Sequence, residues 1–134
     1  MNNPKRDYYD NGNIKFEAYR INGELHREDG PALVDYYEND DVQYEAYYLN
    51  DKRHREDGPA QIWYYEDDTV AYEVYSLNDE LHREDGPAII KHYEDGNVGY
   101  ETYWLNGENM TYGEWMIATA KTDEEKMMRV LQYA

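Results

Sequence analysis

The chain has 134 residues, a formal net charge of −17 and no cysteine. Its length fits one domain or one short repeat array, and the missing thiols exclude disulfides and thiolate metal sites. No apolar run has the length of a signal peptide or of a membrane helix, which predicts a soluble, cytoplasmic protein. Seventeen tyrosines and three tryptophans argue against disorder and predict a thin core built from tyrosine more than from leucine.

A segment of 28 residues recurs along the chain. The cassette His-Arg-Glu-Asp-Gly-Pro-Ala begins at His26, His54 and His82. Because self-similarity at a fixed period indicates a repeat architecture, we expect a β-repeat array over residues 1–110 and a helical cap over residues 111–134. The array divides into one half-unit and three full units, at residues 7–25, 26–53, 54–81 and 82–109.

Each unit is expected to form strands joined by tight turns. Residues 34–37 and 62–65 are β-branched and aromatic, as strands prefer. Residues 42–46 alternate, which predicts that Val42, Tyr44 and Ala46 share one face. Asn-Gly pairs such as Asn22-Gly23 and Asn106-Gly107 tolerate the positive φ of two-residue hairpin turns, and the cassette glycine is expected to do the same. The predicted fold is mainly β: tandem antiparallel hairpins, with two or three strands per unit, forming an elongated twisted sheet.

The C-terminal segment has a helical pattern. Thr111 and Glu114 form a capping-box signature, and Thr122 begins a second one. Two short helices are predicted at residues 112–121 and 123–133. On the second helix, one face carries four apolar residues, namely Met127, Val130, Leu131 and Ala134. We expect the helices to close the open end of the sheet, because a terminal repeat has no neighbour on its outer side.

The cassette has residue types that could also serve chemistry. Successive copies should lie roughly 10–14 Å apart, at ~4.8 Å per strand, so the three histidines cannot share one metal ion. A catalytic group has no reason to recur at every structural period, whereas a turn brace does. We therefore predict no enzyme and no cofactor, with a ligand-binding or catalytic role as the weaker alternatives. The structural motif comprises His26, Arg27, Asp29, Gly30, His54, Arg55, Asp57, Gly58, His82, Arg83, Asp85 and Gly86.

These residues carry a resemblance to a known family. The block Leu-His-Arg-Glu-Asp-Gly-Pro-Ala at residues 25–32, with copies at 54–60 and 81–88, resembles the LHREDGPA repeat proteins of tailed phages and giant viruses, a bacterial-type variant of MORN repeats. The second copy departs from it, since Arg53 replaces the leucine. The resemblance covers about residues 7–134 and implies a β-hairpin array, a viral origin, a location in the host cytoplasm, and a scaffold or interaction role.

Negative charge is concentrated in the three full units, whose net charges are −5, −7 and −4. This predicts a protein-binding module that docks a protein with a basic surface, with a DNA-mimic inhibitor of a host defence (restriction or CRISPR type) or nucleic-acid-binding protein as the alternative. A third possibility is a purely structural repeat protein. Direct binding to nucleic acid or membrane is not expected. The candidate partner-binding residues are Glu38, Asp40, Asp41, Glu66, Asp67, Asp68, Glu73, Asp79, Glu80, Glu94 and Asp95.

Overall fold

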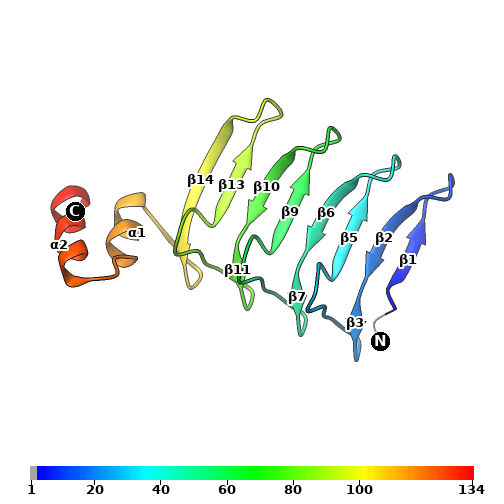
Figure 1. Cartoon of the computed structure of the whole chain (residues 1–134), viewed down its shortest axis with the longest axis horizontal. Coiled ribbons are helices and arrows are strands. Elements are labelled where there is room, and N and C mark those ends of the chain that lie inside the picture. Colours follow the sequence, from blue (N-terminus) through cyan, green and yellow to red (C-terminus); the bar gives the residue numbers. More distant parts are fainter. Residues whose placement is uncertain (1–2) are drawn as a thin grey trace.

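A computed structural model of the protein describes residues 3–134 and contains one large antiparallel sheet (Figure 1). Its strands lie in chain order, and a small separate hairpin stands in the chain between each long hairpin and the next. The predicted mainly β array of hairpins is confirmed. In spatial order the nine strands are β1 (Lys5–Tyr8), β2 (Ile14–Ala18), β5 (Leu33–Tyr36), β6 (Val42–Ala46), β9 (Gln61–Tyr64), β10 (Val70–Val74), β13 (Ile89–His92), β14 (Val98–Leu105) and β15 (Glu108–Met110).

A second, smaller hairpin follows each pair of long strands. Units 26–53 and 54–81 therefore contain four strands each, and the expectation of two or three strands was wrong. The turns of these hairpins have positive φ at both central residues, as predicted for Asn22-Gly23 and Asn106-Gly107. In the last unit β14 runs without a break into its hairpin with β15. The short strands are β3 (Arg20–Ile21), β4 (Glu24–Leu25), β7 (Tyr48–Leu49), β8 (Lys52–Arg53), β11 (Ser76–Leu77) and β12 (Glu80–Leu81).

A β-bulge interrupts every long hairpin. In the β5–β6 hairpin, Val42 pairs with Tyr36 while Tyr44 pairs with Asp35. Adjacent residues of β5 point to opposite faces, so Val42 and Tyr44 do not share a face and that prediction was wrong. The same shift recurs in the hairpins of the other units, which makes the bulge part of the repeat.

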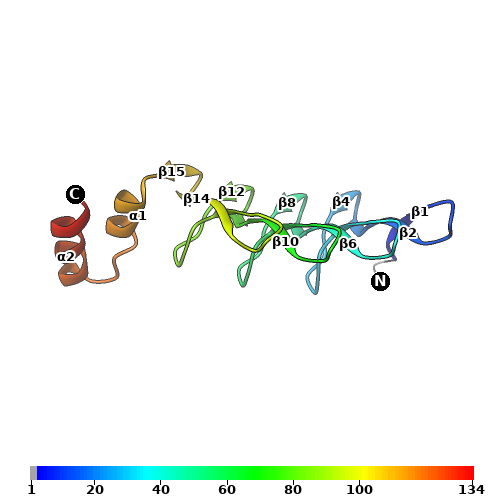
Figure 2. The same ribbon diagram turned by 90° about the horizontal axis from the view of Figure 1, so that it is seen from above.

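The sheet is a single layer, and both helices lie beyond its end rather than over a face (Figures 1 and 2). Its most buried side chains are alanines: Ala32, Ala46, Ala60 and Ala88 are 0% exposed. The predicted tyrosine core is therefore wrong, because the alanines of this single layer are covered by their neighbours while the tyrosine rings remain partly open to solvent. Within residues 3–134, no helix is long and apolar enough to cross a membrane.

The C-terminal helices are α1 (Tyr112–Ala118) and α2 (Asp123–Tyr133). The capping box of Thr111 and Glu114 is confirmed, and Thr122 accepts a hydrogen bond from the Glu125 amide. The first helix ends three residues before the predicted end, because Thr119 forms its C-cap and the chain must extend again before Thr122 can start α2.

The apolar face of α2 does not close the sheet. Met127 and Leu131 are 66% and 78% exposed, and α2 has no buried residue. The helix instead contacts α1, with Arg129 Nη1 donating to Met116 O at 2.6 Å and the Tyr133 ring 5.5 Å from the Tyr112 ring. Among residues 3–134, α1 packs against β14 and β15 while the main contacts of α2 are with α1. The two predicted helices are therefore confirmed, and α1 is the one that closes the end of the sheet.

Candidate functional site

The three cassettes form identical loops that project from one side of the sheet (Figure 2). In the first, Arg27 Nε donates to Asp29 Oδ1 at 3.0 Å and Arg27 Nη1 donates to Pro31 O at 3.2 Å. The guanidinium also lies 4.0 Å from the centroid of the Tyr19 ring. Arg55 and Arg83 repeat these contacts in the second and third cassettes. Each arginine thus ties its own loop to a tyrosine of the preceding hairpin.

The cassette glycines leave room for these arginines. None of the three has the positive φ that was expected, so that prediction was wrong. A Cβ on Gly30 would lie 3.0 Å from Arg27 Cζ, and one on Gly86 would lie 2.7 Å from Arg83 Cζ. Glycine at these positions therefore lets the guanidinium lie directly over the loop backbone, whereas a larger residue would displace it.

The cassette histidines join successive units. His26 Nδ1 accepts a hydrogen bond from the Asn50 amide at 2.9 Å, and His54 and His82 accept from Asn78 and Asn106. Each acceptor bond runs 24 residues forward, to the turn of the next small hairpin. In this arrangement Nδ1 carries no proton, and Nε2 faces the glutamate of its own cassette, at 3.6 Å for His26 and Glu28.

Two further polar contacts link each unit to the next. Tyr37 Oη donates to Tyr64 O at 2.7 Å, and Tyr65 repeats this bond to His92 O. On the cassette side, Glu45 Oε1 accepts from Tyr64 Oη at 2.7 Å. Burial together with this bond raises the pKa of Tyr64. The recurring tyrosines and glutamates therefore hold the units in register.

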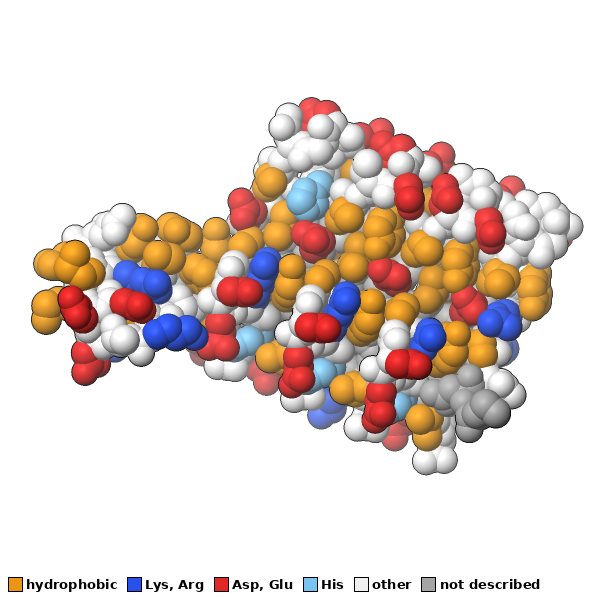
Figure 3. Space-filling model, viewed as in Figure 1, with side chains coloured by type: hydrophobic (Ala, Val, Ile, Leu, Met, Phe, Trp, Pro, Cys, Tyr) orange, Lys and Arg blue, Asp and Glu red, His pale blue; other side chains and the backbone are white. Residues whose placement is uncertain are grey.

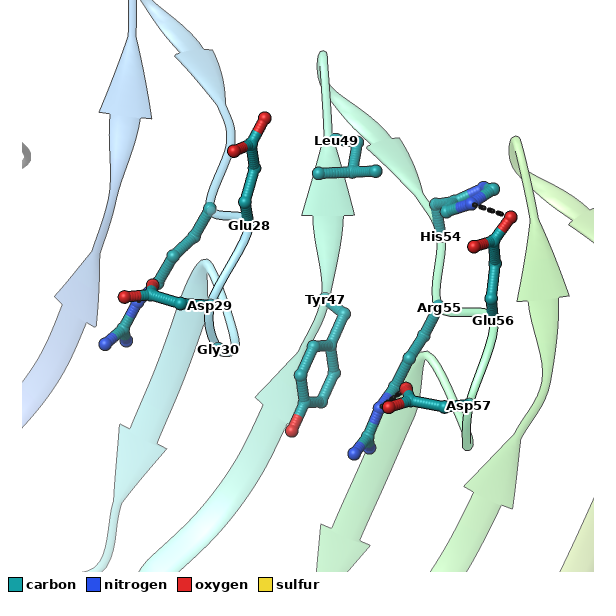
Figure 4. A pocket seen from close by; sticks show the side chains of 10 residues that line it. Glu28, Asp29, Gly30, Tyr47, Leu49, His54, Arg55, Glu56 and Asp57 are labelled. Carbon is teal, nitrogen blue, oxygen red and sulfur yellow. Dashed lines mark hydrogen bonds and ion pairs between the residues drawn. The ribbon is translucent and has the colours of Figure 1, made fainter.

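Two open grooves lie between consecutive cassette loops. The first, about 560 Å³ in volume, has Tyr47 and Leu49 at its base, between the Glu28 loop and the Glu56 loop (Figure 4). The second, of about 370 Å³, is lined by the residues 28 positions further along. The walls carry highly exposed carboxylates, with Glu28 and Glu56 side chains 84% and 85% exposed.

The helical cap fills the position that a third groove would occupy. Trp115 of α1 is buried, its ring lies 4.9 Å from that of Tyr103, and its Nε1 donates to Arg83 O at 2.8 Å. Tyr103 corresponds to the tyrosines that carry an arginine in earlier units, but Thr111 stands where the next arginine would be. The indole therefore takes the place of a guanidinium. The sequence indicated that Trp115 belonged to a helix but not this role.

Many of the exposed carboxylates of the array lie in two rows (Figure 3). We call the first the tip row; it lies in the turns of the long hairpins and comprises Glu38, Asp40, Asp41, Glu66, Asp67, Asp68, Glu94 and Asp95. The second, the cassette row, lies in the projecting loops and comprises Glu28, Asp29, Glu56, Asp57, Glu84 and Asp85. The cassette glutamates were absent from the predicted partner-binding set, although their threefold recurrence could have drawn attention to them.

Three residues of the predicted acidic surface lie elsewhere. Glu73, in β10, is half-buried and pairs with His92 at 3.2 Å. Asp79 and Glu80 belong to a small hairpin, at the opposite end of the strands from the tip row. Asp79 Oδ1 accepts from the Arg53 backbone amide at 3.0 Å and from Arg53 Nε at 2.9 Å, contacts that lower the pKa of Asp79. The eleven predicted residues therefore do not form one surface.

Some members of the tip row also shape their turns. Asp67 Oδ1 accepts from the Thr69 hydroxyl at 2.6 Å and from the Thr69 amide at 3.1 Å, which lowers the pKa of Asp67. Asp40 and Asp68 have positive φ. The glutamates Glu38, Glu66 and Glu94 are exposed. They are therefore the positions where charge can be removed with least effect on the turn.

In the part of the chain that the structure describes, no group of three or more His, Asp or Glu side chains is arranged to bind a metal ion. Comparison with protein families, with characterised proteins and with solved structures finds no match to this chain.

Proposed function

We propose that this protein is a non-enzymatic binding module whose acidic array docks a basic surface of a partner protein. The observation that carries the proposal is the arrangement of exposed carboxylates in two rows that repeat with the units. Buried or braced acids such as Glu45 and Asp79 contribute to folding, whereas the cassette glutamates and the tip glutamates make few contacts within the protein. Charge presented in this way steers association and gives complementarity to a basic surface. By the resemblance in the cassette, we further propose a viral origin and a host protein as the partner.

A second candidate function, mimicry of DNA, is favoured by the density of charge along the array. Each unit contributes one long hairpin, and hence two long strands, to the large sheet, so three units span about 29 Å at ~4.8 Å per strand. Over this length the net charge is −16, or one charge per ~1.8 Å, against one per ~1.7 Å in duplex DNA. The partner would then be a host nucleic-acid-binding protein of a defence system, inhibited at its DNA site.

The test compares two variants with equal loss of charge. The tip variant carries Glu38→Gln, Glu66→Gln and Glu94→Gln, and the control carries Glu24→Gln, Glu108→Gln and Glu124→Gln, which are exposed positions outside both rows. A partner is isolated from host lysate at low salt, purified, and its affinity for each variant measured by titration calorimetry at two salt concentrations. We expect roughly tenfold weaker binding for the tip variant, at up to 1 kcal/mol per lost pair, and little change for the control.

Competition with duplex DNA separates the two functions. Displacement of the protein from its partner by DNA supports mimicry, and binding that DNA does not affect supports the general module. Equal affinities for the tip variant and the control would show that the tip row does not contact the partner. Retention of full affinity at high salt would contradict an electrostatic interface altogether.

A further inference from the structure

We infer that the two open grooves between the cassette loops are binding sites for cationic side chains. Together the two grooves bind one polyproline-II segment that has arginine or lysine at every third residue. The inference rests on the proposed binding of a basic partner and names the form that the partner takes. It is carried by the filled end groove, by the charge of the groove walls and by the spacing of the units.

In the end groove Trp115 covers Tyr103 as Arg55 covers Tyr47 in the first open groove, and it shows in addition that the carbonyl of a cassette arginine can accept a hydrogen bond. There Trp115 donates an N–H to the backbone carbonyl of Arg83 at 2.8 Å. By the 28-residue equivalence, the carbonyls of Arg27 and Arg55 occupy the same position in the two open grooves. Within residues 3–134 neither of these carbonyls accepts a hydrogen bond. Each open groove thus presents an acceptor to which a guanidinium or ammonium group can donate.

The walls of each groove favour a cation. The first is lined by four carboxylates, from the Glu28 and Glu56 loops, and by the two arginines Arg27 and Arg55, which gives a net charge of −2 with neutral His54. The second has the same composition. Both arginines are already committed, since each pairs with the aspartate of its own loop and lies over a tyrosine ring. The glutamates lie 3.6–3.8 Å from the Nε2 of their own histidines, and Glu84 also lies 3.9 Å from Lys121 Nζ. Their side chains are nevertheless 61–85% exposed, so a ligand can reach them.

The spacing of the grooves selects the conformation of the ligand. Consecutive grooves are two strands apart in the large sheet, or ~9.6 Å at ~4.8 Å per strand. A polyproline-II helix has three residues per turn and rises ~3.1 Å per residue, so side chains three residues apart point the same way at ~9.3 Å. In a β-strand, residues three apart point to opposite sides. A polyproline-II segment therefore places two cations into two grooves without strain.

The experiment uses three synthetic peptides of identical composition. Each is an eight-residue proline peptide with two arginines, separated so that the second follows the first by two, three or four positions. Their affinities for the full chain are measured at low salt by fluorescence anisotropy. We expect the peptide with a separation of three to bind about tenfold more tightly than the other two, because only it can engage both grooves at once.

Matched variants locate the effect. Glu28→Gln with Glu56→Gln removes a wall carboxylate from both grooves, and Glu38→Gln with Glu66→Gln removes the same charge from the tip row. The groove variant should lose the preference for a separation of three, and the tip variant should retain it. Far-UV circular dichroism verifies that both variants are folded, which is expected because the substituted side chains are exposed.

Two outcomes overturn the inference. If the three peptides bind the unaltered protein equally and both variants weaken binding alike, the grooves do not read spacing, while the proposed acidic module stands. If no peptide binds at low salt, the grooves are not cation sites, and only the interaction of the tip row with a folded partner remains to support the proposed function.

Discussion

The interior of the array and its C-terminal end hold their units together in different ways. In the interior, polar groups reach forward to the next unit, as Tyr37 does to Tyr64 O and Tyr65 does to His92 O. At the end, the corresponding Tyr93 is 51% exposed, because the chain has turned into helices. The last unit relies instead on the packing of Trp115 against Tyr103. A tyrosine whose hydroxyl bonds to the next unit needs a successor, and the cap replaces this polar link with a buried aromatic ring.

The largest effect is expected from removing Trp115, the residue that packs the helical cap against the last unit. Trp115→Ala should lower the free energy of unfolding by about 3–5 kcal/mol, since it deletes a buried ring and its hydrogen bond. Because α2 contacts α1 rather than the sheet, both helices should detach. Urea unfolding and limited proteolysis of the C-terminal segment measure these effects.

The control for this prediction is Leu131→Ala on α2. That side chain is 78% exposed, and its truncation should change stability by less than about 0.5 kcal/mol. Equal losses for Trp115→Ala and Leu131→Ala would show that the indole does not anchor the cap.

A smaller effect separates an interior tyrosine from its counterpart at the end. Tyr65→Phe removes the hydroxyl that donates to His92 O at 2.6 Å and should cost about 1 kcal/mol. Tyr93→Phe makes the same chemical change where the hydroxyl has no following unit to reach, and should cost close to nothing. Urea midpoints of the two variants provide the measurement, and a larger loss for Tyr93→Phe would contradict the forward-link account.

The smallest effect concerns the protonation of Glu17, in β2 near the N-terminal end of the sheet. Burial raises the pKa of Glu17, but hydrogen bonds from Tyr36 and Arg6 outweigh it and leave the pKa below its usual value. The unfolded chain therefore binds this proton more tightly than the folded protein. The stability that Glu17 contributes is present above the ordinary glutamate pKa and is lost as the pH falls through the lowered value.

Glu17→Gln should consequently reduce the loss of stability between about pH 5 and pH 3, measured as the change in urea midpoint. The matched variant Glu108→Gln alters an exposed carboxylate and should leave the pH profile as it is. An unchanged profile in Glu17→Gln would mean that this carboxylate does not couple folding to protonation.

Local chemistry made much of the fold predictable. The 28-residue period, the Asn-Gly turns and the Thr111 capping box each depend on residues close together in the chain, and these were correctly anticipated. The role of Gly30 was not, because the group that its small size accommodates is the guanidinium of Arg27 folded back over the loop. The bulges were also missed, since the alternation in residues 42–46 carries no sign of the extra residue.

The candidate site was predictable in composition but not in arrangement. Counting charge by unit identified where the acids concentrate, yet it grouped Asp79 and Glu73 with the tip row, although Asp79 braces Arg53 and Glu73 pairs with His92. It also omitted Glu28 and Glu56, which face the open grooves. A carboxylate's availability depends on the partners that the fold brings to it, and these come from other units.

By itself, the sequence determined the period, the antiparallel hairpins and the sites of the turns, because these follow from residue preferences within a few positions. Tertiary structure alone decided that the sheet is a single layer with alanine at its most buried positions, that Trp115 replaces an arginine at the end of the array, and that α2 turns its apolar face outward. Each of these depends on which surfaces meet in space, and the packing of one unit on the next sets that geometry.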